Sequence, residues 1–255
     1  MAEVSSSDRP LLMGLMAQYP HLLADLKWHQ ISNSTNSDLL AELAAGSAGD
    51  WSIRIATNQT SGRGRQGRSW ETPNGSIAAS IAVPLESFHP SPSWLSAITA
   101  IAIKQALTEF LDSSILIKWP NDCFLNQKKF AGILIELGSK NAVVGIGLNI
   151  FSAPDIAQAT HLGLIDYLPP FAAVLKSVFD QVMYCSGFTD AQMRDWMIKE
   201  IDTIGQDVKV DLVSGESILG KAIGLTTAGA LIVEMTTGKL EIHAGDVNHL
   251  RPQNA

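Results

Sequence analysis

Hydrophobic and polar positions along the first half of the chain predict a mixture of strands and helices. Residues 51–57 alternate between apolar and polar side chains, and residues 76–85 form an apolar run, so each segment predicts a strand. Residues 58–75 connect these two strands. Apolar positions three and four residues apart over residues 92–111 predict a long helix after them. The pattern indicates an α+β protein.

The segment before residue 51 predicts a short strand followed by a helix. The strand begins at Trp28, and a polar turn separates it from the helix. Asn36 or Ser37 is expected to cap the start of this helix, and Gly46 to end it. Apolar stripes predict two further helices, at residues 169–185 and 189–201.

Residues 115–150 predict four strands joined by tight turns, and connections this short join antiparallel neighbours. Because successive side chains of a strand point to opposite faces, the last strand has one apolar face and one nearly bare face. The apolar face, which is expected to pack against helices, carries Val144, Ile146, Leu148 and Ile150. The bare face carries Gly145, Gly147 and Asn149.

From residue 206 the pattern changes to short strands with glycine-containing turns. Residues 206–247 predict four such strands, which are typical of a small β-barrel that forms its own domain. The expected fold class is therefore α+β, with a mixed, mainly antiparallel sheet packed with helices and a small C-terminal barrel. We expect three parts: a lead segment (1–27), a larger domain (28–204) and a C-terminal domain (205–255).

Charge and composition narrow the function. The 255 residues carry a formal net charge of −7, which argues against a general nucleic-acid binder because such proteins need a broad basic face. Cys123 and Cys185 lack a partner at metal-motif or redox-motif spacing, so a cytoplasmic setting is expected. The longest apolar segment, residues 94–111, contains Lys104 and Glu109, and the chain does not begin like a secretory signal. We expect no membrane association.

Residues 60–70, TSGRGRQGRSW, concentrate positive charge in an acidic protein. The segment contains Gly62, Gly64 and Gly67, and Arg63, Arg65 and Arg68. Glycines let a backbone move and approach an anion closely, while arginines suit carboxylate or phosphate. The alternatives are a solvated surface loop or an RNA-binding arginine–glycine tail. Such tails lie in disordered regions, whereas this segment joins two strands, so a loop that closes over a ligand is favoured.

Lysines and glycines lie close together in the four strands predicted over residues 115–150. Lys118 and Lys129 lie near strand ends, where a single lysine is most often solvated. Gly132 on one strand and Gly145 with Gly147 on the next would leave a slot beside these lysines. Glycines inside strands cost stability, and close approach of a ligand would explain them; packing or a bulge is the alternative.

Other polar groups are less specific. Ser34, Thr35 and Asn36 lie at a strand-to-helix connection, where they serve as helix caps, as ligand groups or as both. Asp122 and Glu136 are interpreted as structural or supporting groups rather than as an acid–base pair. The histidines show no metal-ligand spacing, and neither a P-loop nor a Gly-x-Ser-x-Gly motif is present.

Five motifs in one order resemble those of the biotin protein ligases. They are STN (34–36), QTSGRGRQGRSW (59–70), KWPND (118–122), KKFAGILIEL (128–137) and GIGLN (145–149). The resemblance covers residues 28–149 and implies a biotin/lipoate ligase-like catalytic core over 28–204 with an SH3-like C-terminal domain. It implies that biotin and ATP form biotinyl-5′-AMP, with Mg²⁺, and that biotin then passes to one lysine of a biotin carboxyl carrier domain. The helix-turn-helix of repressor members would need a longer lead segment, so no DNA binding is expected.

The resemblance also implies residue roles. Lys129 and Arg65 are expected to be catalytic. The biotin-binding set is Ser34, Thr35, Gln59, Gly62, Arg63, Lys129, Gly132, Gly145 and Gly147. The nucleotide-binding set is Arg63, Arg65, Arg68, Trp70, Asn121, Lys129 and Asn149. No metal ligand is certain, and Mg²⁺ is expected near Asn121 and the ATP phosphates.

Two other functions are also compatible with the sequence. A lipoate or octanoate protein ligase would share the core fold but would want a longer apolar tunnel. A protein that binds biotin or a nucleotide without turnover would release no pyrophosphate, and retention of Lys129 with the full arginine segment argues against it. The expected assembly is a monomer or a homodimer.

Overall fold

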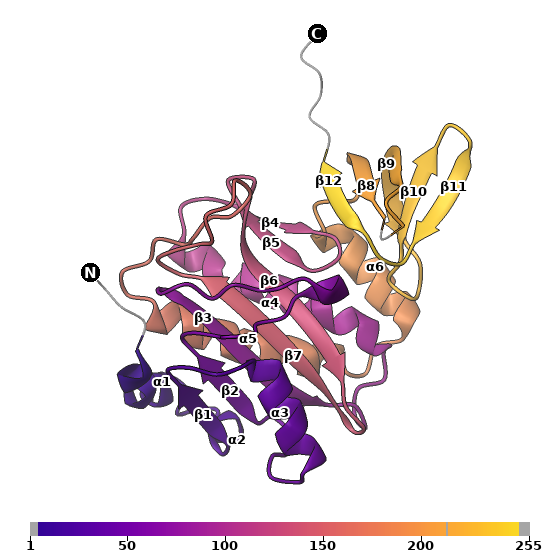
Figure 1. Cartoon of the computed structure of the whole chain (residues 1–255). Coiled ribbons are helices and arrows are strands. Elements are labelled where there is room, and N and C mark those ends of the chain that lie inside the picture. The colour runs from indigo at the N-terminus through magenta and orange to yellow at the C-terminus, as the bar shows by residue number, and fades with distance from the viewer. Residues whose placement is uncertain (1–4, 213, 250–255) are drawn as a thin grey trace.

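The computed structural model describes residues 5–212 and 214–249 and contains two β-sheets (Figure 1). The larger sheet has seven strands in the order β1-β2-β3-β7-β6-β5-β4. Its strands are β1 (Leu26–His29), β2 (Ile53–Ala56), β3 (Ser76–Pro84), β4 (Ile115–Lys118), β5 (Asp122–Leu125), β6 (Lys128–Leu137) and β7 (Asn141–Asn149). The β1–β2 pair is parallel and the other pairs are antiparallel, so the mixed, mainly antiparallel sheet is confirmed.

Helices cover both faces of this sheet. α4 (Leu95–Leu107) and α5 (Leu168–Cys185) pack together on one face, and α3 (Thr35–Ala44) crosses β2, β3 and β7 on the other (Figure 1). The helix predicted over residues 92–111 is α4 extended by a 3₁₀ turn at each end. α6 (Asp190–Glu200) leads to the second sheet and begins with a capping box between Thr189 and Gln192.

The two faces of β7 separate as the alternation predicts. Val144, Ile146 and Leu148 are buried in the main hydrophobic core, which α4 and α5 complete. Gly145 and Gly147 point to the face that carries α3 and the segment 62–70, where the Cβ that each glycine lacks would meet Asn36 or Trp70. The sheet therefore has a packed face and a face with space above the backbone.

The second sheet differs from the expected barrel. It consists of β8 (Asp207–Asp211), β9 (Ser217–Leu225), β10 (Leu231–Met235), β11 (Gly238–Ile242) and β12 (Asp246–His249), in the order β11-β10-β9-β8-β12. Among the described residues, β11 and β12 form its two edges, so it is an open antiparallel sheet. The predicted fourth strand is split into β11 and β12. Gly245 allows this, because a Cβ there would lie 2.8 Å from Val210 Cγ1 as the chain turns onto β8.

Two features near the N-terminus were also predicted wrongly or not predicted. α3 begins at Thr35 with Ser34 as N-cap, not at Asn36 or Ser37, because the side chain of Asn36 is engaged by β3 and β6. The described part of the lead segment folds into α1 (Arg9–Leu15) and α2 (Pro20–Leu23), which bury Leu12, Met16 and Leu22 against the core. Residues 1–4, 213 and 250–255 of the expected segments lie outside the described residues.

Candidate active site

A cavity of about 880 Å³ lies on the α3 face of the larger sheet. Its walls come from the first turn of α3, the segment 62–70, the β4–β5 hairpin and the glycines of β6 and β7. The segment that follows β7 and the β8 and β12 strands of the second sheet complete the rim, with Ile156, Gln158, Asp211 and Asn248. The cavity therefore gathers the chemistry-bearing segments of the sequence in one place.

The segment 62–70, which we call the flap, is a short hairpin rather than an unstructured loop. Trp70 N donates to Gly62 O at 2.9 Å, Gly64 N donates to Arg68 O at 2.7 Å, and Arg63 pairs with Ser69 between them. At the base of the flap only glycine fits at position 62, because a Cβ there would lie 2.3 Å from Trp70 O. The tip turns through Gln66 and Gly67 at φ values of 58° and 73°, the left-handed region that favours glycine.

Two arginines fasten the flap to the sheet at different points. Arg65, at the tip, donates from Nη1 to Asn121 Oδ1 at 3.1 Å, and Asn121 Nδ2 donates to Ile133 O of β6 at 2.6 Å. Arg63, at the base, pairs through Nη2 with Glu136 Oε2 at 2.7 Å. Arg68 lines the cavity beside them. The flap is thus held down over the cavity at both ends.

The glycines of the sheet are covered by two side chains. A Cβ at Gly147 would lie 2.2 Å from Trp70 Cε2, and one at Gly132 would lie 2.8 Å from Trp70 Cζ3, so the Trp70 indole rests directly on the backbone of β6 and β7. Its Nε1 is buried and reaches no hydrogen-bond acceptor among the described residues, so packing holds the ring. A Cβ at Gly145 would lie 2.3 Å from Asn36 Oδ1. All three glycines therefore line the cavity floor and make room for a protein side chain, Asn36 at Gly145 and Trp70 at Gly132 and Gly147.

The first turn of α3 presents uncharged polar groups to one end of the cavity. Gln59 Oε1 accepts a hydrogen bond from Thr35 N at 2.9 Å, and Gln59 Nε2 donates to Thr72 Oγ1 at 3.2 Å. Ser80 Oγ lies 2.7 Å from Thr35 Oγ1 and 2.6 Å from Asn36 Oδ1. Ser34 is buried and lines the same end. These contacts fix donors and acceptors in one geometry.

The other end of the cavity carries Lys129. Its Nζ lies 2.7 Å from Asp122 Oδ1 and 5.4 Å from the centre of the Trp70 ring. The Lys129 backbone is held from outside the sheet, since its N–H donates to Gln158 O at 2.7 Å and its carbonyl accepts from Thr160 N at 2.9 Å. Asn149 Nδ2 donates to Thr160 O at 3.0 Å and so holds this outer segment in place.

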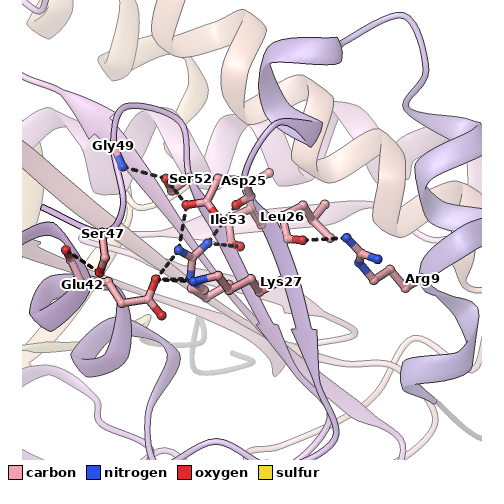
Figure 2. Close-up of polar contacts among 10 residues, drawn as sticks. Arg9, Asp25, Leu26, Lys27, Glu42, Ser47, Gly49, Ser52 and Ile53 are labelled. Atoms are coloured by element: carbon pink, nitrogen blue, oxygen red, sulfur yellow. Dashed lines mark hydrogen bonds and ion pairs between the residues drawn. The ribbon is translucent and has the colours of Figure 1, made fainter.

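The opposite end of α3 is held by a charged cluster on β1 and β2 (Figure 2). Arg54 of β2 is 1% exposed, and its guanidinium binds Glu42 of α3 as well as the carboxylate of Asp25, 2.7 Å away. Lys27 Nζ adds a bond of 2.9 Å to Glu42. Arg54 pairs in register with Ser80 of β3, so polar side chains meet α3 along one row of the sheet. The cluster and the Ser80 contacts together fix the position of α3.

We expect the stability contributed by Glu42 to disappear at acid pH. The hydrogen bond from Arg54 lowers the pKa of Glu42 from 4.5 to about 2. A depressed carboxyl pKa stabilises the folded state above the unfolded pKa, and the effect is lost as pH falls through the folded value. Glu42→Gln should therefore lower the free energy of unfolding by about 3 kcal/mol at pH 7. Urea unfolding should show this difference shrinking between about pH 4.5 and about pH 2. A difference independent of pH would contradict the charge argument.

Nearly all of the candidate residues from the sequence line this cavity. Gly62 is the exception, because it lies at the base of the flap and not in the wall. Further residues contact members of this set. Asn36 was offered by the sequence as a cap or ligand group, and Asp122 and Glu136 as structural or supporting groups. Thr72, Ser80 and Gln158 were not considered. Ser80 and Thr72 carry no signal in a single sequence.

Three further features of the described residues concern metal clusters, cysteines and helix length. They contain no group of three or more His, Cys, Asp and Glu side chains that could hold a metal ion. Cys123 and Cys185 are both buried and unpaired, and burial raises the pKa of the Cys185 thiol to about 12. Within the part of the chain that the structure describes, no helix has the length and apolar character needed to span a membrane.

Comparison with known proteins identifies the class. Residues 28–150 match the sequence profile of the biotin/lipoate A/B protein ligase family, and residues 203–250 match that of the biotin protein ligase C-terminal domain. The chain is 30% identical to the biotin–[acetyl-CoA-carboxylase] ligase of Mycobacterium tuberculosis, over 88% of this chain and 90% of that protein. It is 31% identical to the corresponding Paracoccus denitrificans ligase, over 85% and 97%.

A solved structure agrees with these sequences. The biotin protein ligase from Aquifex aeolicus in complex with biotin and ATP superposes with a TM-score of 0.74 at 26% identity, covering 89% of this chain and 99% of that one. The fold is thus that of a ligase which binds biotin and ATP. The chain belongs to the biotin protein ligase family.

Proposed function

We propose that the cavity joins biotin to ATP and then passes biotin to a lysine of a biotin carboxyl carrier domain. The observation that carries this proposal is the division of the cavity into a polar end at Thr35 and Gln59, where Arg63 is paired with Glu136, and a cationic end at Lys129 and Arg65. The neutral ureido head of biotin suits the first end. Its carboxylate and the ATP phosphates suit the second, because arginine and lysine bind such anions.

In the first step a biotin carboxylate oxygen attacks the α-phosphorus of ATP. The bond to the pyrophosphate leaving group breaks, and biotinyl-5′-AMP remains. Two anions must approach each other, so cations that hold them and stabilise charge developing at the α-phosphate lower the barrier. Lys129 is proposed to bridge the carboxylate and the α-phosphate, and Arg65 to bind the phosphates from the tip of the flap. In the second step the neutral amine of the carrier lysine attacks the biotinyl carbonyl carbon and AMP leaves.

Magnesium fits this site as a partner of the ATP phosphates. Mg²⁺ is commonly held by one or two carboxylates together with substrate phosphates. Asp122 is the carboxylate beside Lys129, and its neighbour Asn121 already accepts a bond from Arg65. We propose that Asp122, and not only Asn121, would supply an oxygen ligand to Mg²⁺. The ion would neutralise charge on the ATP phosphates at this end of the cavity.

A lipoate or octanoate ligase remains the second candidate because the matched profile covers both activities. The polar contacts among Thr35, Gln59 and Ser80 favour a polar head group over an acyl chain. Pyrophosphate release measured with biotin, lipoate or octanoate separates the candidates. Release with biotin alone is expected, and release with only an acyl chain would overturn the assignment.

Several broader features belong to the same proposal. The catalytic domain is proposed to span residues 28–204 and the C-terminal domain residues 205–255, which the two separate sheets support. The net charge of −7 supports the absence of DNA binding, and the two unpaired cysteines support a cytoplasmic location. A monomer or a homodimer is proposed as the assembly.

Arg65→Gly is expected to release the flap tip. The change removes the bond from Arg65 Nη1 to Asn121 Oδ1, so the flap should open more often and activated biotin should escape. Biotin labelling of a bystander protein such as serum albumin should rise about tenfold, an effect of about 1.4 kcal/mol on retention. Arg194→Gly, which removes an arginine paired with Asp195 on α6, is the control. Equal labelling by the two variants would show that the tip contact does not retain the adenylate.

A further inference from the structure

Glu136 lies in the KKFAGILIEL motif (128–137), but the proposed reaction gives it no role. It lies on β6 on the same face as Gly132, because residues an even number apart share a face of a strand. Its Oε2 accepts a hydrogen bond of 2.9 Å from Asn36 Nδ2 and pairs with Arg63 Nη2 at 2.7 Å. One carboxylate oxygen thus joins the base of the flap to the first turn of α3.

This carboxylate completes a hydrogen-bonded path around the polar end of the cavity. The path runs through Arg63, Glu136, Asn36, Ser80, Thr35, Gln59 and Thr72. Gln59 precedes the flap and Thr72 follows it, so both ends of the flap and the arginine at its base are tied to the same turn of α3. A charge-assisted bond such as Arg63–Glu136 is stronger than the neutral bonds of the path.

The exposure of the pair separates an effect on the flap from an effect on the fold. The Arg63 side chain is 45% exposed and the Glu136 side chain is 24% exposed. Partly exposed ion pairs contribute little to global stability. Removing this pair should therefore leave the sheet folded while it changes how often the flap opens.

We propose that Glu136 is the latch of the flap. It is a positioning residue that holds Arg63 against β6 and α3, keeps the flap closed over the cavity and thereby sets how long an activated ligand stays bound. The role of Glu136 in retaining an activated ligand rests on the proposed function, whereas its effect on flap opening does not. Arg63 acts with Glu136 at the polar end, whereas Arg65 acts at the phosphate end.

Hydrogen exchange of the whole chain, followed by mass spectrometry without any ligand, tests the latch. The amides of Gly64 and Trp70 are bonded within the flap, so their exchange reports its opening. Glu136→Gln keeps an oxygen that accepts from Asn36 but removes the charge. It should raise exchange in the flap about two- to tenfold while exchange in β7 and the unfolding temperature stay unchanged.

Two further variants make the result decisive. Glu234→Gln, which removes an acid paired with Lys239 on β10 and β11, is the matched control and should leave flap exchange unchanged. The charge swap Arg63→Glu with Glu136→Arg should return flap exchange towards that of the parent protein. Unchanged exchange in Glu136→Gln, equal loss of protection in β7, or failure of the swap to restore protection would each overturn the latch.

A parallel measurement links the latch to the reaction. The rate at which pre-formed biotinyl-5′-AMP leaves Glu136→Gln should rise by the same factor as the flap exchange. If the parent protein forms no biotinyl-5′-AMP while flap exchange still responds to the charge, the proposed function fails and the latch stands. If the adenylate forms but leaves Glu136→Gln at the parent rate, the retention role is overturned.

Discussion

Lys129→Ala is expected to slow adenylation about a hundredfold, equivalent to about 3 kcal/mol of transition-state stabilisation. The reason is electrostatic, because Lys129 is proposed to lie where the carboxylate meets the α-phosphate. Its backbone is fixed by Gln158 and Thr160, so the loss of charge should not displace the strand. Single-turnover formation of biotinyl-5′-AMP is the measurement.

Lys128→Ala is the matched control for this prediction. Lys128 is the preceding residue of β6, is exposed and does not line the cavity. It should form the adenylate at the parent rate. A near-normal rate for Lys129→Ala, or an equal loss in both variants, would remove Lys129 from the role that we give it.

Gly147→Ala is expected to raise the KM for biotin about 10- to 100-fold, because a methyl group on the cavity floor costs about 1–3 kcal/mol in a packed site. The new Cβ would lie 2.2 Å from Trp70 Cε2 in the present arrangement, so neither the indole nor a ligand could rest on the backbone there. Steady-state kinetics with saturating ATP measures the effect. Because the displaced Trp70 belongs to the expected nucleotide-binding set, the KM for ATP should rise as well.

Gly224→Ala controls for the general cost of replacing a strand glycine. Its added Cβ would find the nearest heavy atom, Ile198 Cδ1, 3.9 Å away. The unfolding temperature and both KM values should stay close to those of the parent. Normal biotin kinetics in Gly147→Ala would show that the ligand does not lie on this floor.

Local patterns predicted most of the fold because their physical causes are local. The alternation in residues 144–150 identified the buried face of β7 correctly, since side chains of a strand alternate between faces. The open second sheet was not predicted. A closed barrel and an open sheet have the same pattern of short strands and turns, and the addition of β12 to β8 depends on the tight approach at Gly245.

The sequence predicted which residues line the cavity, with the exception of Gly62, but not how they are arranged. The sequence did not reveal that Arg54 is buried, because α3, from another part of the chain, covers its face of β2. The sequence also did not show why position 145 needs a glycine, since the neighbour of Gly145 is the Asn36 side chain. Contacts between distant segments, such as Arg63 with Glu136, carry no local signal.

The most direct test of the proposed function is pyrophosphate release from ATP in the presence of Mg²⁺ and biotin, followed by transfer of biotin to an added biotin carboxyl carrier domain. Release that depends on biotin is expected, and mass spectrometry should then locate one biotin on one carrier lysine. Biotin binding without pyrophosphate release, or release without transfer to the carrier, would contradict it.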